Sequence, residues 1–223
     1  MTVIFVVATI IFFLGVDWLV RWARQRRAPA TASAVQSAPA MIPVRTPEGI
    51  FFARSHTWLN LFPSGRVRLG VDDFVGSLLD NPEVTLMRSP GERVDRGDPL
   101  VALSDGERRL IIRAPIAGEI LAVNNALEKD PALMHKKLFS DGWAYTIRPN
   151  GVEELRAMLL GEESRHWIAE EMRRLRDLLA GIGPAASLAP AVLQDGGSPA
   201  PGLLKHLDAS AWKRFEAEFL SVE

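Results

Sequence analysis

The chain has 223 residues, of which 48% are hydrophobic, and a formal net charge of −1. This length and apolar content suffice for one compact domain with additional segments, and the near-neutral charge gives no electrostatic argument for binding nucleic acid. Cysteine is absent, which excludes disulfides, cysteine-held clusters and thiol chemistry. The histidines lack the spacing of metal ligands, so no metal site is predicted: His56, His135, His166 and His206.

Residues 1–22 are predicted to form a transmembrane anchor. Residues 3–16 are almost entirely apolar, and residues 18–20 extend the run past Asp17. About 20 helical residues, each rising about 1.5 Å, just cross a hydrocarbon core of about 30 Å. Basic residues follow the run and none precedes it, which favours an anchor with its C-terminal side in the cytoplasm. A cleaved signal peptide and an interfacial or buried helix are the alternatives.

Residues 23–48 are rich in Ala, Pro, Ser and Thr, a composition typical of a flexible linker. Residues 49–160 are predicted to form the folded domain, because short apolar segments such as 66–71, 84–86 and 143–147 alternate with Gly and Pro turns. Many short strands with few long helices indicate a β-sandwich or flattened barrel. Asp72 is expected to cap a short helix, Trp58 to lie in the core, and His56 to be a hydrogen-bonded surface or strand-end residue.

Residues 101–123 are predicted to form a hairpin followed by a corner. An apolar strand at 101–103 leads into a polar tip at 104–108 containing Asp-Gly, which is a strong hairpin signal, and 110–113 runs back. The charged side chains of this tip are an interaction site or simply solvated groups: Asp105, Glu107, Arg108 and Arg109.

Residues 152–160 and 161–180 are predicted to be helical, and the second helix carries an apolar stripe that consists of Ile168, Met172, Leu175 and Leu179. Packing on the domain or binding a partner would both explain this stripe. Residues 181–202 are a second predicted linker, and 203–223 a C-terminal amphipathic helix. Aromatic residues at spacings of three and four suit docking in cis or a partner groove: Trp212, Phe215 and Phe219.

From about residue 51 to 160 the chain resembles the H protein of the glycine cleavage system, which carries lipoate. The matching features occur in the family's order. They are the H-x-W of residues 56–58, the segment 69–74, paired glycines at 91 and 97, the P-[VI]-x-G stretch at 115–118 with Val123 and Asn124, Asp130-Pro131, Gly142-Trp143 and Ile147-Arg148-Pro149. The resemblance implies a mainly β, lipoyl-domain-like fold of the hammerhead hybrid-motif type, with C-terminal helices added after an N-terminal transmembrane helix.

The family attaches lipoate to a lysine that lies ten residues after its second glycine and eight residues before the proline of its P-[VI]-x-G stretch. Counting from Gly97 and from Pro115 leads to the same position, which is Glu107. Glutamate has no amine to form the lipoyl amide, and the guanidinium groups of Arg108 and Arg109 do not replace it. The sequence therefore predicts no lipoyl cofactor. The lysines of the chain lie outside the tip: Lys129, Lys136, Lys137, Lys205 and Lys213.

These observations favour a membrane-anchored H-like protein without lipoate, acting as a non-enzymatic interaction or scaffold module. Its expected partners are the membrane and glycine cleavage or other lipoate-handling proteins. One alternative is a functional H protein with lipoate on Lys129, Lys136 or Lys137. Another is a membrane-fusion or efflux adaptor with a lipoyl-like domain. No nucleophile–base arrangement, metal set or phosphate-binding loop is evident, so no catalytic residue is predicted.

Overall fold

The computed structural model describes residues 45–79, 81–181 and 202–220. The predicted transmembrane anchor and most of both predicted linkers lie outside these residues. Among the helices of the described part, none is long and apolar enough to cross a bilayer.

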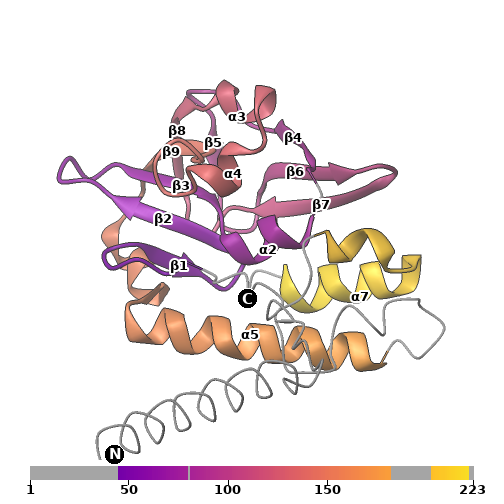
Figure 1. Ribbon diagram of the computed structural model, residues 1–223. Coiled ribbons are helices and arrows are strands. Elements are labelled where there is room, and N and C mark those ends of the chain that lie inside the picture. The colour runs from indigo at the N-terminus through magenta and orange to yellow at the C-terminus, as the bar shows by residue number, and fades with distance from the viewer. Residues whose placement is uncertain (1–44, 80, 182–201, 221–223) are drawn as a thin grey trace, which may run out of the picture. The chain divides into compact units, whose positions relative to one another are not determined.

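Two antiparallel sheets form the centre of the described chain (Figure 1). The larger has the strand order β10-β1-β2-β3-β9-β8-β5, and the smaller has the order β4-β6-β7. The strands are β1 (Phe51–Ala53), β2 (Thr57–Leu61), β3 (Val67–Val71), β4 (Glu83–Leu86), β5 (Arg93–Val94), β6 (Pro99–Asp105), β7 (Arg108–Arg113), β8 (Gly118–Val123), β9 (Tyr145–Pro149) and β10 (Leu159–Leu160).

Short helices connect the strands, and longer helices follow them. The α-helices are α2 (Asp73–Leu78), α3 (Asn125–Lys129), α4 (Leu133–Lys136), α5 (Glu162–Gly181) and α7 (Ala209–Phe219), and the 3-10 helices are η1 (Val152–Ala157) and η2 (Leu203–His206). A β-rich fold of antiparallel sheets with C-terminal helices is therefore confirmed.

Local sequence explains helix α2. Its N-cap is Asp72, whose Oδ1 accepts a hydrogen bond from the backbone N–H of Val75 at 3.1 Å. This bond satisfies one of the first amides of the helix, which have no partner inside the helix itself. The predicted cap is confirmed, and all the residues of α2 are buried.

One tyrosine links the two sheets across the core. The hydroxyl of Tyr145, on β9, donates to the carbonyl oxygen of Leu100 on β6 at 2.8 Å, and accepts from the backbone N–H of Arg88 at 3.1 Å. Tyr145 is fully buried, as is Trp58 on β2, so the core position predicted for Trp58 is confirmed. Burial of the phenol raises the pKa of Tyr145 to about 12.

The predicted helix over 152–160 is wrong in its second half. After η1 the chain forms β10, which pairs with β1 by placing Leu160 opposite Phe51 and Leu159 opposite Phe52. A two-residue strand has no sequence period of its own, and the pairing partner lies at the start of the domain. The tertiary contact therefore decides the conformation of this segment.

The apolar stripe predicted for α5 is partly wrong. Ile168 and Leu175 are buried as expected, but Met172 and Leu179 are only partly buried. The buried face also includes residues outside the stripe, namely Trp167, Glu171 and Leu178. A glutamate lies on this face because other side chains satisfy one of its carboxylate oxygens.

Candidate functional site

The predicted hairpin is formed by β6 and β7, and its turn is tighter than the sequence suggested. The strands pair as far as Asp105 opposite Arg108, so only two residues form the turn. The first of them, Gly106, has a φ of 64°, which glycine adopts without steric cost. Gly106 and Glu107 are both exposed. Glu107 therefore lies at the outermost point of the hairpin.

The four charged residues predicted for the tip have different surroundings. Glu107 and Arg109 are exposed, whereas Asp105 and Arg108 are partly buried. One carboxylate oxygen of Asp105, Oδ2, is buried and has no hydrogen-bond partner among the described residues. The four side chains thus do not form a single cluster of solvated charges.

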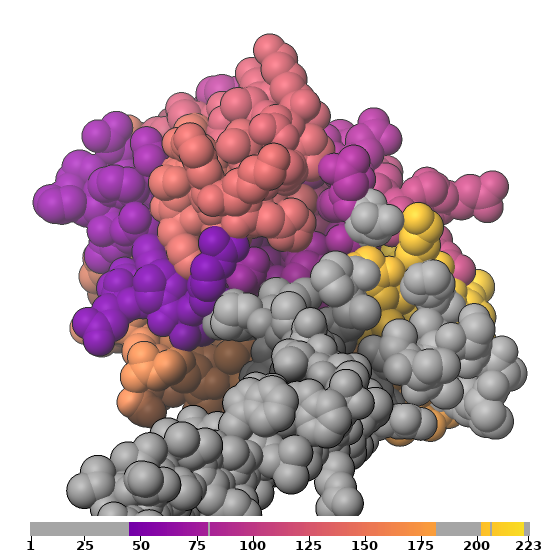
Figure 2. Space-filling view, in the orientation of Figure 1, coloured from indigo at the N-terminus to yellow at the C-terminus, as the bar shows by residue number. Residues whose placement is uncertain are grey.

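Arg108 connects the hairpin to the C-terminal segment, defined here as residues 202–220. Its Nη1 donates to the carbonyl oxygens of Leu204 at 3.1 Å and Lys205 at 3.4 Å. Its guanidinium carbon lies 5.4 Å from the ring centroid of Trp212, within the range of a cation–π interaction. Figure 2 shows the hairpin tip, in pink, beside the yellow C-terminal segment. The amphipathic helix predicted over 203–223 is shorter in the structure, where α7 spans Ala209–Phe219 after the separate η2, and α7 packs in cis.

Helix α7 has its own N-cap. The Oδ1 of Asp208 accepts from the backbone N–H groups of Ser210 and Ala211, each at 2.8 Å. The hydrogen bond from Ala211, followed by the one from the Ser210 hydroxyl, lowers the pKa of Asp208. The aromatic residues predicted to form the apolar face, Trp212, Phe215 and Phe219, are all buried.

A second arginine, on α5, contacts the far end of α7. Nη2 of Arg174 donates to the carbonyl oxygen of Glu218 at 2.8 Å, and its guanidinium carbon lies 4.9 Å from the ring centroid of Phe219. The last carbonyls of a helix have no partner within the helix, so a cation placed there satisfies them. Helix α7 is thus contacted by an arginine near each end.

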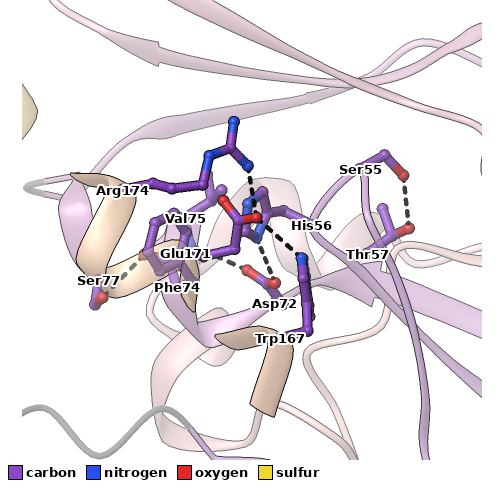
Figure 3. A network of polar contacts seen from close by, with 10 residues as sticks. All are labelled: Ser55, His56, Thr57, Asp72, Phe74, Val75, Ser77, Trp167, Glu171 and Arg174. Carbon is purple, nitrogen blue, oxygen red and sulfur yellow. Dashed lines mark hydrogen bonds and ion pairs between the residues drawn. The ribbon is translucent and has the colours of Figure 1, made fainter. Parts of the chain in front are cut away.

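Side chains of α5 and of the segments before β2 and α2 form a group of polar contacts, most of them buried (Figure 3). Nδ1 of His56 lies 2.8 Å from Oδ2 of Asp72, and both side chains are fully buried. Glu171 Oε1 accepts from the indole N–H of Trp167 at 3.0 Å and from Nη1 of Arg174 at 2.7 Å. Figure 3 shows the side chains from α5 beside the pair of His56 and Asp72.

The surface alternative for His56 is wrong, because the side chain is buried, but the strand-end alternative and the predicted hydrogen bond are confirmed: His56 directly precedes β2. His56 has a φ of 57°, which is unusual for a residue other than glycine, and its ring stacks on Phe74 at a centroid distance of 4.5 Å. Rings of Trp167 and Phe219 lie 5.1 and 6.4 Å away. Three helices, α2, α5 and α7, therefore each place an aromatic ring against this imidazole.

Sequence reasoning missed Glu171, Trp167 and Arg174 as members of this network. The signal was the spacing of three and four residues along one helix, which places Arg174 and Trp167 beside Glu171. The Glu171 side chain is only 6% exposed, and this burial could not be read from the spacing, because surface ion pairs have the same pattern.

The lysines considered as alternative lipoyl sites lie on other elements. Lys129 ends α3, Lys136 ends α4, and Lys137 forms an ion pair with Asp141 at 2.7 Å. That hydrogen-bonded ion pair raises the pKa of Lys137. Lys205 belongs to η2, where its carbonyl accepts from Arg108, so its backbone lies beside the hairpin without being part of it.

Metal chemistry has no evident site in the described ranges, where His, Asp and Glu side chains do not gather in threes. His135 lies against Gly76 on α2, and its burial lowers its pKa. The backbone carbonyl of His135 accepts from Nη2 of Arg45 at 2.6 Å, and the same guanidinium pairs with Asp73 at 3.1 Å. These contacts hold α4 against α2 and are explained by packing.

Comparison with known proteins identifies the family. A family model described as "Glycine cleavage H-protein" matches residues 50–172. The H protein of Shewanella loihica is 30% identical over 125 residues, which cover 56% of this chain and 97% of that protein. The H protein of Psychrobacter sp. (strain PRwf-1) is 28% identical over 117 residues, 52% of this chain and 93% of that protein.

Among solved structures, a glycine cleavage system H protein from Mycobacterium marinum aligns with a TM-score of 0.49 and 24% identity, covering 55% of this chain and 98% of that one. Proteins of the matched family are carriers and are not themselves enzymes. The family model spans the sheets, η1 and the first half of α5, and leaves the C-terminal segment unmatched. By this match over more than half of its length, the chain belongs to the glycine cleavage H-protein family.

Proposed function

We propose that this protein is a membrane-anchored H-like protein that carries no lipoate and acts as a non-enzymatic interaction or scaffold module. The proposal rests on the identity and the position of Glu107. It occupies the turn of the β6–β7 hairpin, at the position where the resemblance places the family's lipoyl lysine. In a carrier protein the cofactor supplies the chemistry, and the fold holds the cofactor out to other proteins. A hairpin without an amine cannot attach the cofactor and retains only an exposed surface that other proteins can contact.

The geometry of the hairpin supports a presenting role. Its turn is exposed, and its strands belong to a three-stranded sheet whose inner face is buried: Leu103, Leu110 and Ile112 are at most 1% exposed. A fixed base with an exposed turn suits the docking of another protein. By the same resemblance we infer that the two sheets correspond to the lipoyl-type sandwich or flattened barrel.

The membrane part of the proposal rests on the sequence of residues 1–27. An apolar run long enough to span a bilayer precedes four arginines, and this charge order orients the domain toward the cytoplasm. The expected partners are proteins that handle lipoylated H proteins, which the module would recruit or compete for. Nucleic acid is not an expected partner.

Intact mass measurement of the full chain from a lipoate-replete host tests the loss of the cofactor. The expected mass is that of the unmodified polypeptide. An H protein with a lysine at the position equivalent to 107, expressed in the same host, is the control for an active lipoyl ligase. A mass increase equal to a lipoyl group, mapped to any lysine, would overturn the proposal and favour a working carrier.

Topology and partners need separate measurements. A reporter fused to the C-terminus should be active in the cytoplasm, and activity on the opposite side would instead favour the adaptor alternative. Affinity purification of the full chain from its own membranes should recover lipoate-handling proteins. Substituting the exposed Glu107 of the turn and the exposed Arg109 of β7 should abolish that recovery if the hairpin is the contact surface.

A further inference from the structure

The C-terminal segment contacts the rest of the domain on three elements. Arg108 of β7 donates to the end of η2, the carbonyl oxygen of Ser77 on α2 accepts from the N–H of Gly202 at 3.2 Å, and Arg174 of α5 donates to the end of α7. Between these polar contacts, α7 buries its aromatic face. Phe219 stacks on Phe74 at 5.8 Å and on Phe215 at 4.9 Å.

The surface that receives α7 is formed entirely by other parts of the chain. Its apolar centre is Phe74 with His56 and Trp167, and Arg108 and Arg174 lie near opposite ends of the bound helix. Both arginines direct their N–H groups at backbone carbonyls of the segment and their guanidinium planes at its aromatic rings. Arg174 contacts a carbonyl at the C-terminal end of α7, whereas the carbonyls that Arg108 contacts belong to η2. The surface therefore recognises an aromatic helix face with a free C-terminal carbonyl, preceded by a turn that offers carbonyls to Arg108.

The helical conformation of α7 depends on packing against this surface, so α7 acts as an intramolecular ligand of it. It has 11 residues, and isolated helices of this length are marginal in water, so packing rather than propensity stabilises it. It follows residues 181–202, whose composition predicts a linker. A tethered ligand of this kind competes with any outside ligand at an effective concentration on the order of 1 mM.

We propose that the surface around Phe74, with Arg108 and Arg174 at its ends, is a helix-docking site that binds an amphipathic helix of a partner protein in place of α7. The partner helix carries aromatic residues at spacings of three and four, as Trp212, Phe215 and Phe219 do. Displacement of α7 removes the contact of Arg108 with Trp212, and displacement of η2 together with α7 also removes the contact with Leu204. Partner binding therefore also releases Arg108 at the base of the hairpin turn. This site is separate from the turn itself, and its existence does not depend on whether the chain is lipoylated.

A peptide comprising residues 202–220, labelled with fluorescein, serves as the probe, and the full chain in detergent is the receptor. Phe215→Asp in the full chain prevents its own α7 from docking and leaves the receiving surface unchanged. Ala217→Asp introduces the same charge on the exposed face of α7 and is the matched control. For a peptide with a dissociation constant of about 10 µM, we expect about 100-fold tighter binding to the Phe215→Asp chain than to the unmodified or Ala217→Asp chain.

A peptide that itself carries Phe215→Asp should not bind any of the three chains. Absence of peptide binding to a Phe215→Asp chain whose circular dichroism matches that of the unmodified chain would overturn the proposal. Equal binding to all three chains would overturn it too, because the tether would then have no competing effect.

Hydrogen exchange of the unmodified chain decides the matter if Phe215→Asp prevents folding. A releasable segment exchanges its amides in α7 at least about 10-fold faster than those in β2 and β3, since it opens without global unfolding. Protection of α7 equal to that of β2 and β3 would show that the segment is a fixed part of the core, and the docking site would be rejected.

Discussion

Nδ1 of His56 and Oδ2 of Asp72 lie 2.8 Å apart in the interior, with neither side chain exposed. This distance is that of a hydrogen bond between the imidazole and the carboxyl group. The other oxygen of the same carboxylate accepts from the N–H of Val75 at the start of α2. One aspartate therefore fixes both the entry of α2 and the orientation of the ring against which α5 and α7 pack.

Asp72→Ala is expected to lower the free energy of unfolding by about 3 kcal/mol. Loss of the N-cap accounts for about 1 kcal/mol, and leaving the buried imidazole N–H without an acceptor accounts for about 2 kcal/mol. Asp72→Asn is the matched control, because asparagine caps well and its amide can pair with the other tautomer of His56. Urea unfolding measures both variants. Equal losses for the two would show that neither the cap nor the pair is what this residue contributes.

Arg108→Ala should increase hydrogen exchange in α7 by about 10-fold, corresponding to about 1.4 kcal/mol for two neutral-acceptor hydrogen bonds and a cation–π contact. Hydrogen exchange with mass spectrometry on peptides covering residues 203–219 is the measurement. Arg109→Ala removes the same charge from the next residue, which is exposed, and should leave α7 unchanged. An equal effect of both variants would mean that net charge rather than the Leu204 contact stabilises the segment.

Two glycines should differ in their tolerance of alanine. A Cβ at Gly118 would collide with the Arg148 carbonyl and lie 2.6 Å from Cγ2 of Ile147, so Gly118→Ala is expected to cost about 3 kcal/mol. A Cβ at Gly106 would meet nothing within 4 Å, and its φ of 64° alone makes Gly106→Ala cost about 1 kcal/mol. Thermal or urea unfolding distinguishes the two. Gly106→Ala as costly as Gly118→Ala would contradict the open surroundings of the turn.

The parts of the fold that the sequence predicted are those whose cause is local. An aspartate directly before an apolar helix predicted the cap at Asp72, and Asp-Gly between two apolar runs predicted the β6–β7 hairpin. Strand β10 was not predicted, because Leu159 and Leu160 become a strand only by pairing with β1. No local pattern distinguishes two leucines at the end of a strand from two at the end of a helix.

The same division applies to the candidate site. The order of motifs placed Glu107 at the turn, since it depends only on counting along the chain. The burial of His56 and Glu171 and the docking of Arg108 on Leu204 depend on contacts with distant segments; Arg108 and Leu204 are 96 residues apart. A charged hairpin residue is solvated in most proteins, so only the position of the C-terminal segment reveals that Arg108 is engaged.

The raised pKa of Tyr145 predicts how the free energy of unfolding changes at alkaline pH. Burial raises its pKa from the ordinary value of 10.0 to about 12, so between these values the folded chain keeps a proton that the unfolded chain has lost. Binding more protons in the folded state makes the free energy of unfolding fall as pH rises. The stabilisation is complete below about pH 10 and is lost progressively toward pH 12.

Tyr145→Phe removes this titration together with the hydrogen bonds to Leu100 and Arg88, which join the two sheets. At pH 8 the variant should be less stable by about 1–2 kcal/mol, because the partly buried N–H of Arg88 loses its acceptor and the Leu100 carbonyl keeps only the hydrogen bond from the N–H of Met87. Between pH 10 and 12 its stability should fall less steeply than that of the unmodified chain. Urea unfolding at pH 8, 9, 10 and 11 gives both quantities. Since the other titrating groups are common to both chains, parallel curves above pH 10 would show that Tyr145 ionises in the folded state as readily as in the unfolded state.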